Sequence, residues 1–163
     1  MTDRKKFLND VNKIVIKIGT SSLTKKDCDF TKENCSIDPS FMERIAFQVS
    51  ELRKQGKEVI LVSSGAIGVG LYELGIAPKP REIPIRQAAA AVGQSILMQY
   101  WSEAFSKYGM KVAQILLTYE FYSDRVSYLN LRNSISTLLE YGVVPIINEN
   151  DCTCTNEIEA IFG

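Results

Sequence analysis

Three aliphatic runs in this chain end abruptly in small polar residues. They are I-V-I-K-I-G-T-S-S (14–22), V-I-L-V-S-S-G-A-I-G-V-G (59–70) and V-V-P-I-I-N-E-N-D (143–151). Continuous apolar runs are typical of buried parallel strands, and open α/β sheets bind their ligands beyond the carboxyl ends of such strands. The three endings therefore predict one binding site at one edge of a parallel sheet.

The segments between these runs have the apolar spacing of amphipathic helices. The clearest helix begins at Asp38 and Pro39, a capping residue followed by a first-turn proline, and ends near Gly56. Further helices are predicted over 65–74, 85–108 and 124–142, and a further strand over 111–117. In the longest helix, the residues predicted to share one face are Ala88, Val92, Ile96, Tyr100 and Ala104.

The remaining segments are predicted to be an arm and two loops. Residues 1–13 are predicted to form a polar arm or a short helix. The charged stretch 25–37 has no periodicity, which indicates a loop or a small hairpin. Three of the five prolines fall in 76–84, which predicts an extended surface loop. The order of strands and helices predicts one α/β domain over 1–163, a three-layer αβα sandwich with a mainly parallel sheet.

Charge and hydropathy argue against nucleic acid and membrane as partners of this chain. Nineteen basic residues balance nineteen acidic ones, so no net positive charge favours nucleic acid or an anionic membrane surface. No apolar run approaches the roughly 20 residues that a membrane-spanning helix needs. The basic residues near the start precede the polar F-L-N-D-V-N rather than an apolar core, so we expect no targeting signal there. We expect a cytoplasmic protein with a small polar ligand, without nucleic acid or membrane as a partner.

The four cysteines do not predict a metal site. Cys28 and Cys35 have C-x6-C spacing and Cys152 and Cys154 have C-x-C spacing, neither of which is a usual zinc pattern, and the chain has no histidine. We expect reduced thiols and no bound metal. Cys152 follows Asp151 directly and can line the predicted site.

Each of the three endings suits an anionic or zwitterionic ligand, although each also has a purely structural explanation. Lys17 and the backbone N–H of Gly19 suit phosphoryl oxygens, but a strand lysine is commonly a solvated edge charge. Ser63-Ser64-Gly65 leads from a strand into a helix, where free N–H groups bind anions, but serine is also an ordinary N-cap. Asn148 to Asp151 offer acceptors for an ammonium group and donors for a carboxylate, but such residues are common in turns.

The conjunction of the three endings indicates binding of an amino acid next to a transferring phosphoryl group. Several other enzyme classes lack their motifs here. There is no G-x-x-x-x-G-K-[ST] phosphate loop, no G-x-G-x-x-G dinucleotide motif and no G-x-S-x-G elbow. Without histidine, a Ser-His-Asp triad is also impossible.

These motifs resemble a known family. V-I-K-I-G-T-S-S, V-S-S-G-A-I-G-V-G, Q-A-A-A-A-V-G-Q-S, A-Q-I-L-L-T and V-V-P-I-I-N-E-N-D together are similar to the amino-terminal part of the glutamate 5-kinases, or γ-glutamyl kinases, of the amino-acid kinase family. Other members of that family usually have two glycines where this chain has Gly19-Thr20. The N-E-N-D ending further favours the glutamate enzymes.

The resemblance implies an amino-acid kinase fold and transfer of the ATP γ-phosphoryl group to the side-chain carboxylate of L-glutamate. The product is γ-glutamyl phosphate, in the first step of proline biosynthesis, and Mg²⁺ accompanies the ATP. By position, Lys17 would neutralise the transferring group and Gly19 would contact the ATP phosphates. Ser64 and Gly65 would bind glutamate, and Asp151 would hold its α-ammonium group with support from Asn148.

The resemblance also implies regulation and assembly. In the family, the segment that corresponds to 76–86 takes part in glutamate binding and in feedback inhibition by proline, and members form homo-oligomers. The family continues past the point where this chain stops, into a nucleotide-binding half that these residues do not contain. We therefore expect this acceptor-binding half alone to be inactive.

Three alternatives remain open from the sequence. The chain can be a non-catalytic α/β module that senses glutamate or proline through the same strand-end site. It can also have another acceptor specificity of the amino-acid kinase family. A structural or assembly fragment is the third alternative.

Overall fold

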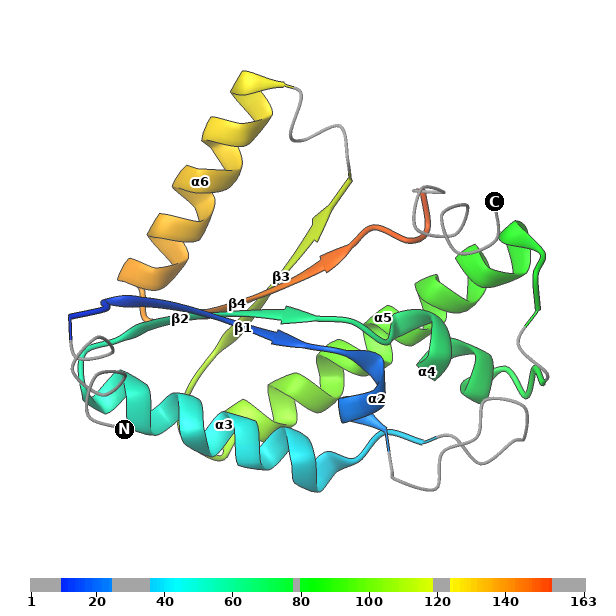
Figure 1. The fold of residues 1–163 in the computed structure, drawn as a ribbon, viewed down its shortest axis with the longest axis horizontal. Coiled ribbons are helices and arrows are strands. Elements are labelled where there is room, and N and C mark those ends of the chain that lie inside the picture. Colours follow the sequence, from blue (N-terminus) through cyan, green and yellow to red (C-terminus); the bar gives the residue numbers. More distant parts are fainter. Residues whose placement is uncertain (1–9, 25–35, 78–79, 119–123, 154–163) are drawn as a thin grey trace.

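Four parallel strands form the sheet at the centre of the molecule (Figure 1). The computed structural model describes residues 10–24, 36–77, 80–118 and 124–153. In these ranges the strands have the order β1-β2-β4-β3. Every neighbouring pair is parallel, so the carboxyl ends of all four strands lie at one edge. The strands are β1 (Lys13–Ile18), β2 (Glu58–Ser63), β3 (Val112–Leu117) and β4 (Val144–Glu149).

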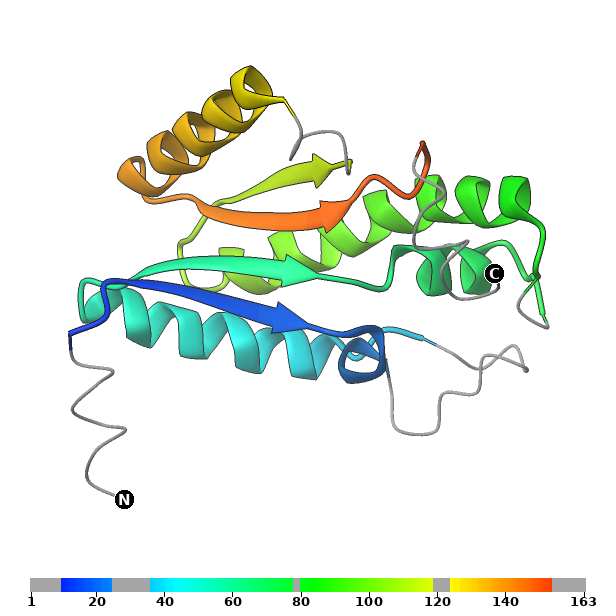
Figure 2. The ribbon, with the colours of Figure 1, turned by 45° about the horizontal axis from the view of Figure 1, so that its top comes forward.

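Helices cover both faces of the sheet, as Figures 1 and 2 show. Helices α3 and α5 lie on one face and α6 lies on the other, while α4 packs along α5 near the carboxyl ends of the strands. The predicted three-layer α/β sandwich is therefore confirmed in the described part of the chain. The helices are α2 (Thr20–Leu23), α3 (Pro39–Lys54), α4 (Ala66–Glu73), α5 (Ile83–Ser106) and α6 (Arg125–Glu140).

The main hydrophobic core lies between the sheet and the α3/α5 layer. Strand side chains alternate between the two faces of a sheet, and β2 directs Val59, Leu61 and Ser63 to the buried side. Trp101 and Phe105 of α5 are fully buried in this core and their rings are 5.9 Å apart. This layer holds the site elements in fixed positions, because α5 also contacts α4 and β3.

The layer formed by α6 is packed much less tightly against the sheet than the α3/α5 layer. None of the described residues of α6 is fully buried, and its predicted apolar face is only half-buried where it faces the sheet. On the same side of the sheet, Val15 of β1 is 63% exposed. The half-buried residues of α6 are Leu131, Ile135, Leu138 and Leu139.

The structure corrects three details of the predicted elements. The first strand begins at Lys13 rather than Ile14, and a four-residue helix, α2, follows it. Helix α5 begins at Ile83, before Pro84, because proline lacks only an N–H that the first turn of a helix does not use. Residues 1–9 of the predicted polar arm and residues 25–35 lie outside the described residues. Lys13, the last residue of that arm, belongs to β1, and Thr24 and Ile37 form an antiparallel bridge.

The predicted face of α5 was wrong. Ala88 is exposed and Val92, Ile96 and Tyr100 are only half-buried, so Ala104 alone of the predicted five is buried. The buried stripe lies one position along the helix, because small residues there fit against α4. Its members include Ala89, Ala90, Gly93, Gln94, Leu97, Trp101, Ala104 and Phe105.

Among the described residues, no helix combines the length and the apolar character that crossing a membrane requires.

Candidate active site

The carboxyl ends of the strands converge, as the sequence predicted. After β2, the backbone N–H of Ser64 donates to the carbonyl of Ile18 at 3.0 Å, which joins the ends of β1 and β2. After β4, the N–H of Asn150 donates to the carbonyl of Leu117 at 2.7 Å, which joins the ends of β4 and β3. The polar turns that follow the strands are therefore held at the same edge of the sheet.

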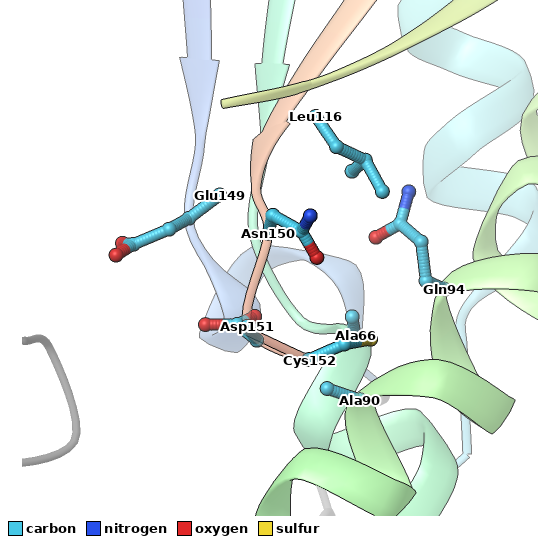
Figure 3. Close-up of a pocket in the computed structure, with 8 residues that line it drawn as sticks. All are labelled: Ala66, Ala90, Gln94, Leu116, Glu149, Asn150, Asp151 and Cys152. Carbon is cyan, nitrogen blue, oxygen red and sulfur yellow. The ribbon is translucent and has the colours of Figure 1, made fainter. Parts of the chain in front are cut away.

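A small pocket opens at this edge, between the start of α4, the middle of α5 and the turn after β4 (Figure 3). Its cavity volume is about 10 Å³, roughly the space of one water molecule. It can therefore admit one small polar group of a ligand, with the rest of the ligand extending outward. The lining residues are Ala66, Ala90, Gln94, Leu116, Glu149, Asn150, Asp151 and Cys152.

The two serines after β2 have different environments. Ser63 is fully buried and its hydroxyl accepts a hydrogen bond from Trp101 Nε1 at 3.0 Å, so this hydroxyl belongs to the core. Ser64 is half-buried at the turn that leads to α4. Ser64, which the sequence assigned to the site, is therefore the more accessible of the two serines, although neither of them lines the pocket.

Gly65 makes the sharp turn into α4. Its φ of 111° lies in the region that only glycine adopts easily, and its carbonyl accepts the N–H of Val69 at 3.0 Å. Ala66, the first residue of α4, lines the pocket. The first N–H groups of a helix have no partner within the helix and carry partial positive charge, so this end of α4 suits an anionic group.

Two close contacts fix α4 against α5. A Cβ atom added at Gly93 would overlap the carbonyl oxygen of Ala66, and one added at Gly70 would overlap the carbonyl oxygen of Ala89. The glycines in V-S-S-G-A-I-G-V-G and Q-A-A-A-A-V-G-Q-S therefore include positions that allow two helix backbones to touch. This packing sets the position of the α4 N-terminus in the pocket wall.

Asn148 does not line the pocket itself. It is buried on the α5 side of β4, and its Nδ2 donates to Gln94 Oε1 at 2.8 Å. Gln94 Nε2 in turn donates to Gln114 Oε1 of β3 at 3.1 Å. Gln94 lines the pocket together with Asn150, and sequence reasoning did not assign Gln94 to the site. No local pattern identified Gln94, because the face of α5 that was predicted to be buried does not include it.

Asp151 lies in the pocket wall, and its role in binding stays a prediction. It is 9% exposed, in the turn after β4, and the half-buried thiol of Cys152 lies next to it. Glu149 extends away from the pocket (Figure 3). Within the described ranges no group of three histidine, cysteine or acidic residues has a metal-binding arrangement, and Cys28, Cys35 and Cys154 lie outside those ranges.

Lys17 lies on the other face of the sheet. It pairs in register with Val62, which pairs with Ile147, so its exposed side chain projects opposite to that of Asn148. Gly19 follows at the end of β1, and a Cβ atom placed there would meet no atom within 4 Å among the described residues. The open space at Gly19 allows a phosphate group to approach the backbone closely.

Comparison with known proteins gives a consistent result over the whole chain. The sequence model of the amino acid kinase family matches residues 12–163. The chain is 91% identical over 163 residues to a protein named "Glutamate 5-kinase" from Methanosarcina barkeri. The aligned region covers 100% of this chain and 43% of that protein. It is 88% identical over its whole length to the protein of the same name from Methanosarcina mazei, of which it covers 42%.

More distant relatives have the same name. A "Glutamate 5-kinase" from Geobacter sp. is 47% identical over 160 residues, covering 98% of this chain and 40% of the relative. The chain thus spans about two fifths of the length of the curated relatives that it matches. The resemblance inferred from the sequence motifs is confirmed, and the chain belongs to the amino acid kinase family.

Proposed function

We propose that the natural protein containing this chain is a glutamate 5-kinase. It transfers the γ-phosphoryl group of ATP to the side-chain carboxylate of L-glutamate and gives γ-glutamyl phosphate, the first step of proline biosynthesis. The observation that carries the proposal is 91% identity over all 163 residues to a protein named "Glutamate 5-kinase". The polar pocket at the strand ends supports the same conclusion.

The acceptor binds at the pocket edge in this proposal. Asp151 holds the α-ammonium group of glutamate, while Ser64, Gly65 and the N-terminus of α4 bind a carboxylate. Asn148 supports the site from the layer behind, which agrees with its hydrogen bond to Gln94. An acidic side chain and the positive end of a helix dipole around one pocket suit a zwitterion.

ATP binds with Mg²⁺ on the β1 side of the acceptor. Bound ATP supplies the phosphoryl group, and Mg²⁺ neutralises part of its charge. The residues present fit phosphates, because Gly19 has open space beside its backbone and Lys17 is an exposed cation at the end of β1. The Lys17 ammonium group attracts the anionic phosphoryl oxygens and stabilises their charge during transfer.

This reaction needs no general base. The acceptor group is already a carboxylate at neutral pH, so positioning and electrostatic stabilisation are sufficient. The absence of histidine from the chain is compatible with this chemistry. Positioning is supported by the fixed contact between α4 and α5, which determines where the α4 N-terminus lies.

The proposal extends to regulation, assembly and location. Proline inhibits the enzyme by feedback through 76–86, a segment that leads into α5 and ends at the buried Arg86. The enzyme forms homo-oligomers, with support from exposed apolar side chains on α6 such as Val126 and Leu129. It acts in the cytoplasm, as expected for an enzyme that uses ATP and free glutamate.

The test is ATP-dependent formation of γ-glutamyl phosphate, trapped with hydroxylamine, by the longest natural form of this protein. Glutamate, aspartate and N-acetylglutamate are compared as acceptors, and we expect activity with glutamate only. Glutamate binding by the folded protein without phosphotransfer would contradict the proposal and favour a sensing module. Activity restricted to another acceptor would favour a different specificity within the family.

The role of Asp151 is tested by Asp151→Ala in the same assay. Loss of its carboxylate removes a charge-assisted contact, so we expect the KM for glutamate to rise by about tenfold or more. Glu140→Ala, at an exposed position at the end of α6, is the matched control. An unchanged KM in a folded Asp151→Ala protein would exclude this assignment.

A further inference from the structure

A chain of three side-chain amides crosses the layer between α5 and the sheet. Asn148 Nδ2 donates to Gln94 Oε1 at 2.8 Å, and Gln94 Nε2 donates to Gln114 Oε1 at 3.1 Å. The three residues come from β4, α5 and β3. Because one bond uses the oxygen of Gln94 and the other uses its nitrogen, the two neighbours together fix which way its carboxamide faces.

Gln94 is the member of this chain that lines the pocket. It follows Ala90 by one helical turn, so both lie on the face of α5 that borders the pocket, and the small side chains of Ala90 and Ala66 leave space in front of the amide. Figure 3 shows Gln94 and Asn150 extending toward each other from opposite sides. Gln94 is only 8% exposed, so it has been placed inside the protein at the cost of desolvating a polar group.

The hydrogen-bond capacity of Gln94 exceeds these two bonds. A carboxamide has two N–H groups, and the bond to Gln114 uses one of them. Among the described residues, no hydrogen bond uses the second N–H. Figure 3 shows the carboxamide oxygen of Gln94 on the side of Asn150 and its nitrogen turned toward Leu116, which also lines the pocket. The pocket lining therefore includes the carboxylate of Asp151 on the β4 side and, on the α5 side, an amide with an unused N–H.

We propose that Gln94 binds the amino-acid acceptor directly, donating its second N–H to a carboxylate oxygen, while Asn148 and Gln114 hold the carboxamide in that orientation. This inference rests on the proposed kinase function and adds a residue to its acceptor site. Asn148 then acts through Gln94 and is a positioning residue. A neutral donor suits this place, since a cation there would attract Asp151 and compete with the ammonium group of the substrate.

The proposal is tested by steady-state kinetics of two variants of the full natural protein, each with one substitution at Gln94. Gln94→Met keeps the length of the side chain and removes the amide, and Gln94→Glu keeps the shape but puts a negative charge where a carboxylate would bind. Gln99→Met is the matched control, because Gln99 lies on the exposed side of the same helix and contacts Glu103. The KM for glutamate, the KM for ATP, kcat and Tm are measured for each protein.

Loss of a hydrogen bond to a charged group predicts an increase of about ten- to a hundredfold in the KM for glutamate in Gln94→Met. We expect a larger increase in Gln94→Glu, an ATP KM within about twofold of wild type in both, and no change in Gln99→Met. If Gln94 only joined α5 to the sheet, Tm would fall while the KM for glutamate stayed within about twofold of wild type, and that result would overturn the proposal.

The outcomes separate this inference from the proposed function. Wild-type activity on glutamate with unaltered KM values in the folded Gln94 variants overturns only the role of Gln94. A wild type that phosphorylates none of glutamate, aspartate and N-acetylglutamate overturns both. Should Gln94→Met fail to fold, Gln94→Glu provides the same comparison with a side chain of the original shape.

Discussion

The two faces of the sheet are built in different ways. On the α3/α5 face, Leu97, Trp101 and Phe105 are completely buried, and α4 and α5 touch through backbone at Gly70 and Gly93. On the opposite face α6 has no fully buried residue in the described part of the chain. The same sheet thus has one tightly packed side and one that is only partly covered.

This difference explains where the pocket lies. Its walls come from α4, α5 and the ends of β3 and β4, which are the elements that the tight packing holds together. A site that acts by positioning must be held by rigid neighbours. The α6 side instead has exposed apolar residues, including Val126, Tyr128 and Leu129, which suits contact with other protein surface.

The largest expected effect comes from breaking the contact between α4 and α5. In Gly93→Ala the new Cβ would overlap the backbone of Ala66, so α4 must move, and we expect a loss of more than about 3 kcal/mol in the free energy of unfolding. Gly19→Ala is the control for stability, because φ is −81° there and no described atom lies within 4 Å of the new methyl group. Denaturant unfolding of both variants measures the contrast. Equal stabilities would show that the helix contact is adaptable.

A second comparison tests the two layers directly with one kind of substitution. Leu97→Ala removes a fully buried side chain from the tight side, and Leu138→Ala removes a half-buried one from α6. We expect Leu97→Ala to cost about 2 kcal/mol more than Leu138→Ala, because only the first leaves an enclosed cavity. Urea unfolding curves of the two variants give the difference. A cost for Leu138→Ala that matched that of Leu97→Ala would mean that α6 is as tightly packed as α5.

The adjacent serines provide a finer test of the boundary between core and site. Ser63→Ala leaves the buried N–H of Trp101 without its acceptor, which should lower the free energy of unfolding by about 1–3 kcal/mol. Ser64→Ala, at the half-buried turn, should change stability by about 0.5 kcal/mol or less. Under the proposed function, Ser64→Ala instead raises the KM for glutamate. If Ser64→Ala lowered the stability and Ser63→Ala raised the KM for glutamate, Ser64 would belong to the core and Ser63 to the site.

Local patterns were sufficient to predict most of the fold. The runs of β-branched residues predicted the strands, and the capping signals at Asp38 and Asp124 predicted α3 and α6, because these features depend on neighbours in sequence. The buried face predicted for α5 was wrong because its alanines fit either a buried or an exposed position. The contact of Ala89 with Gly70 decides which face is covered. Helix α2 was missed because four residues are too few to have a period.

The site was harder to predict because it depends on register and on distant partners. Strand alternation alone does not show that Lys17 and Asn148 project from opposite faces, since that requires the pairing of β1 with β2 and of β2 with β4. Gln94 contacts residues 20 and 54 positions away in sequence, so no local pattern identifies it. Ser64, Gly65 and Asp151 were found at the predicted edge because each directly follows a strand or its turn; their roles stay predictions.

The smallest expected effect concerns the exposed start of α6. Asp124 accepts hydrogen bonds from the N–H groups of Val126 and Ser127 at 3.4 and 2.7 Å. The pKa of Asp124 is lowered, first by the hydrogen bond from the Ser127 side chain and then by its backbone N–H. A lowered pKa in the folded state means that the ionised cap stabilises the protein above the unfolded pKa, and that this contribution is lost as the pH falls through the folded value.

The contribution is measured as the difference in unfolding free energy between wild type and Asp124→Asn. Asparagine still caps a helix but does not titrate, so the difference should be constant near pH 7 and shrink below about pH 4. Because the cap is at the surface and belongs to the thinly packed layer, this change should be smaller than any in the α4/α5 layer. A difference that stays constant down to about pH 3 would show that the charge of Asp124 does not stabilise α6.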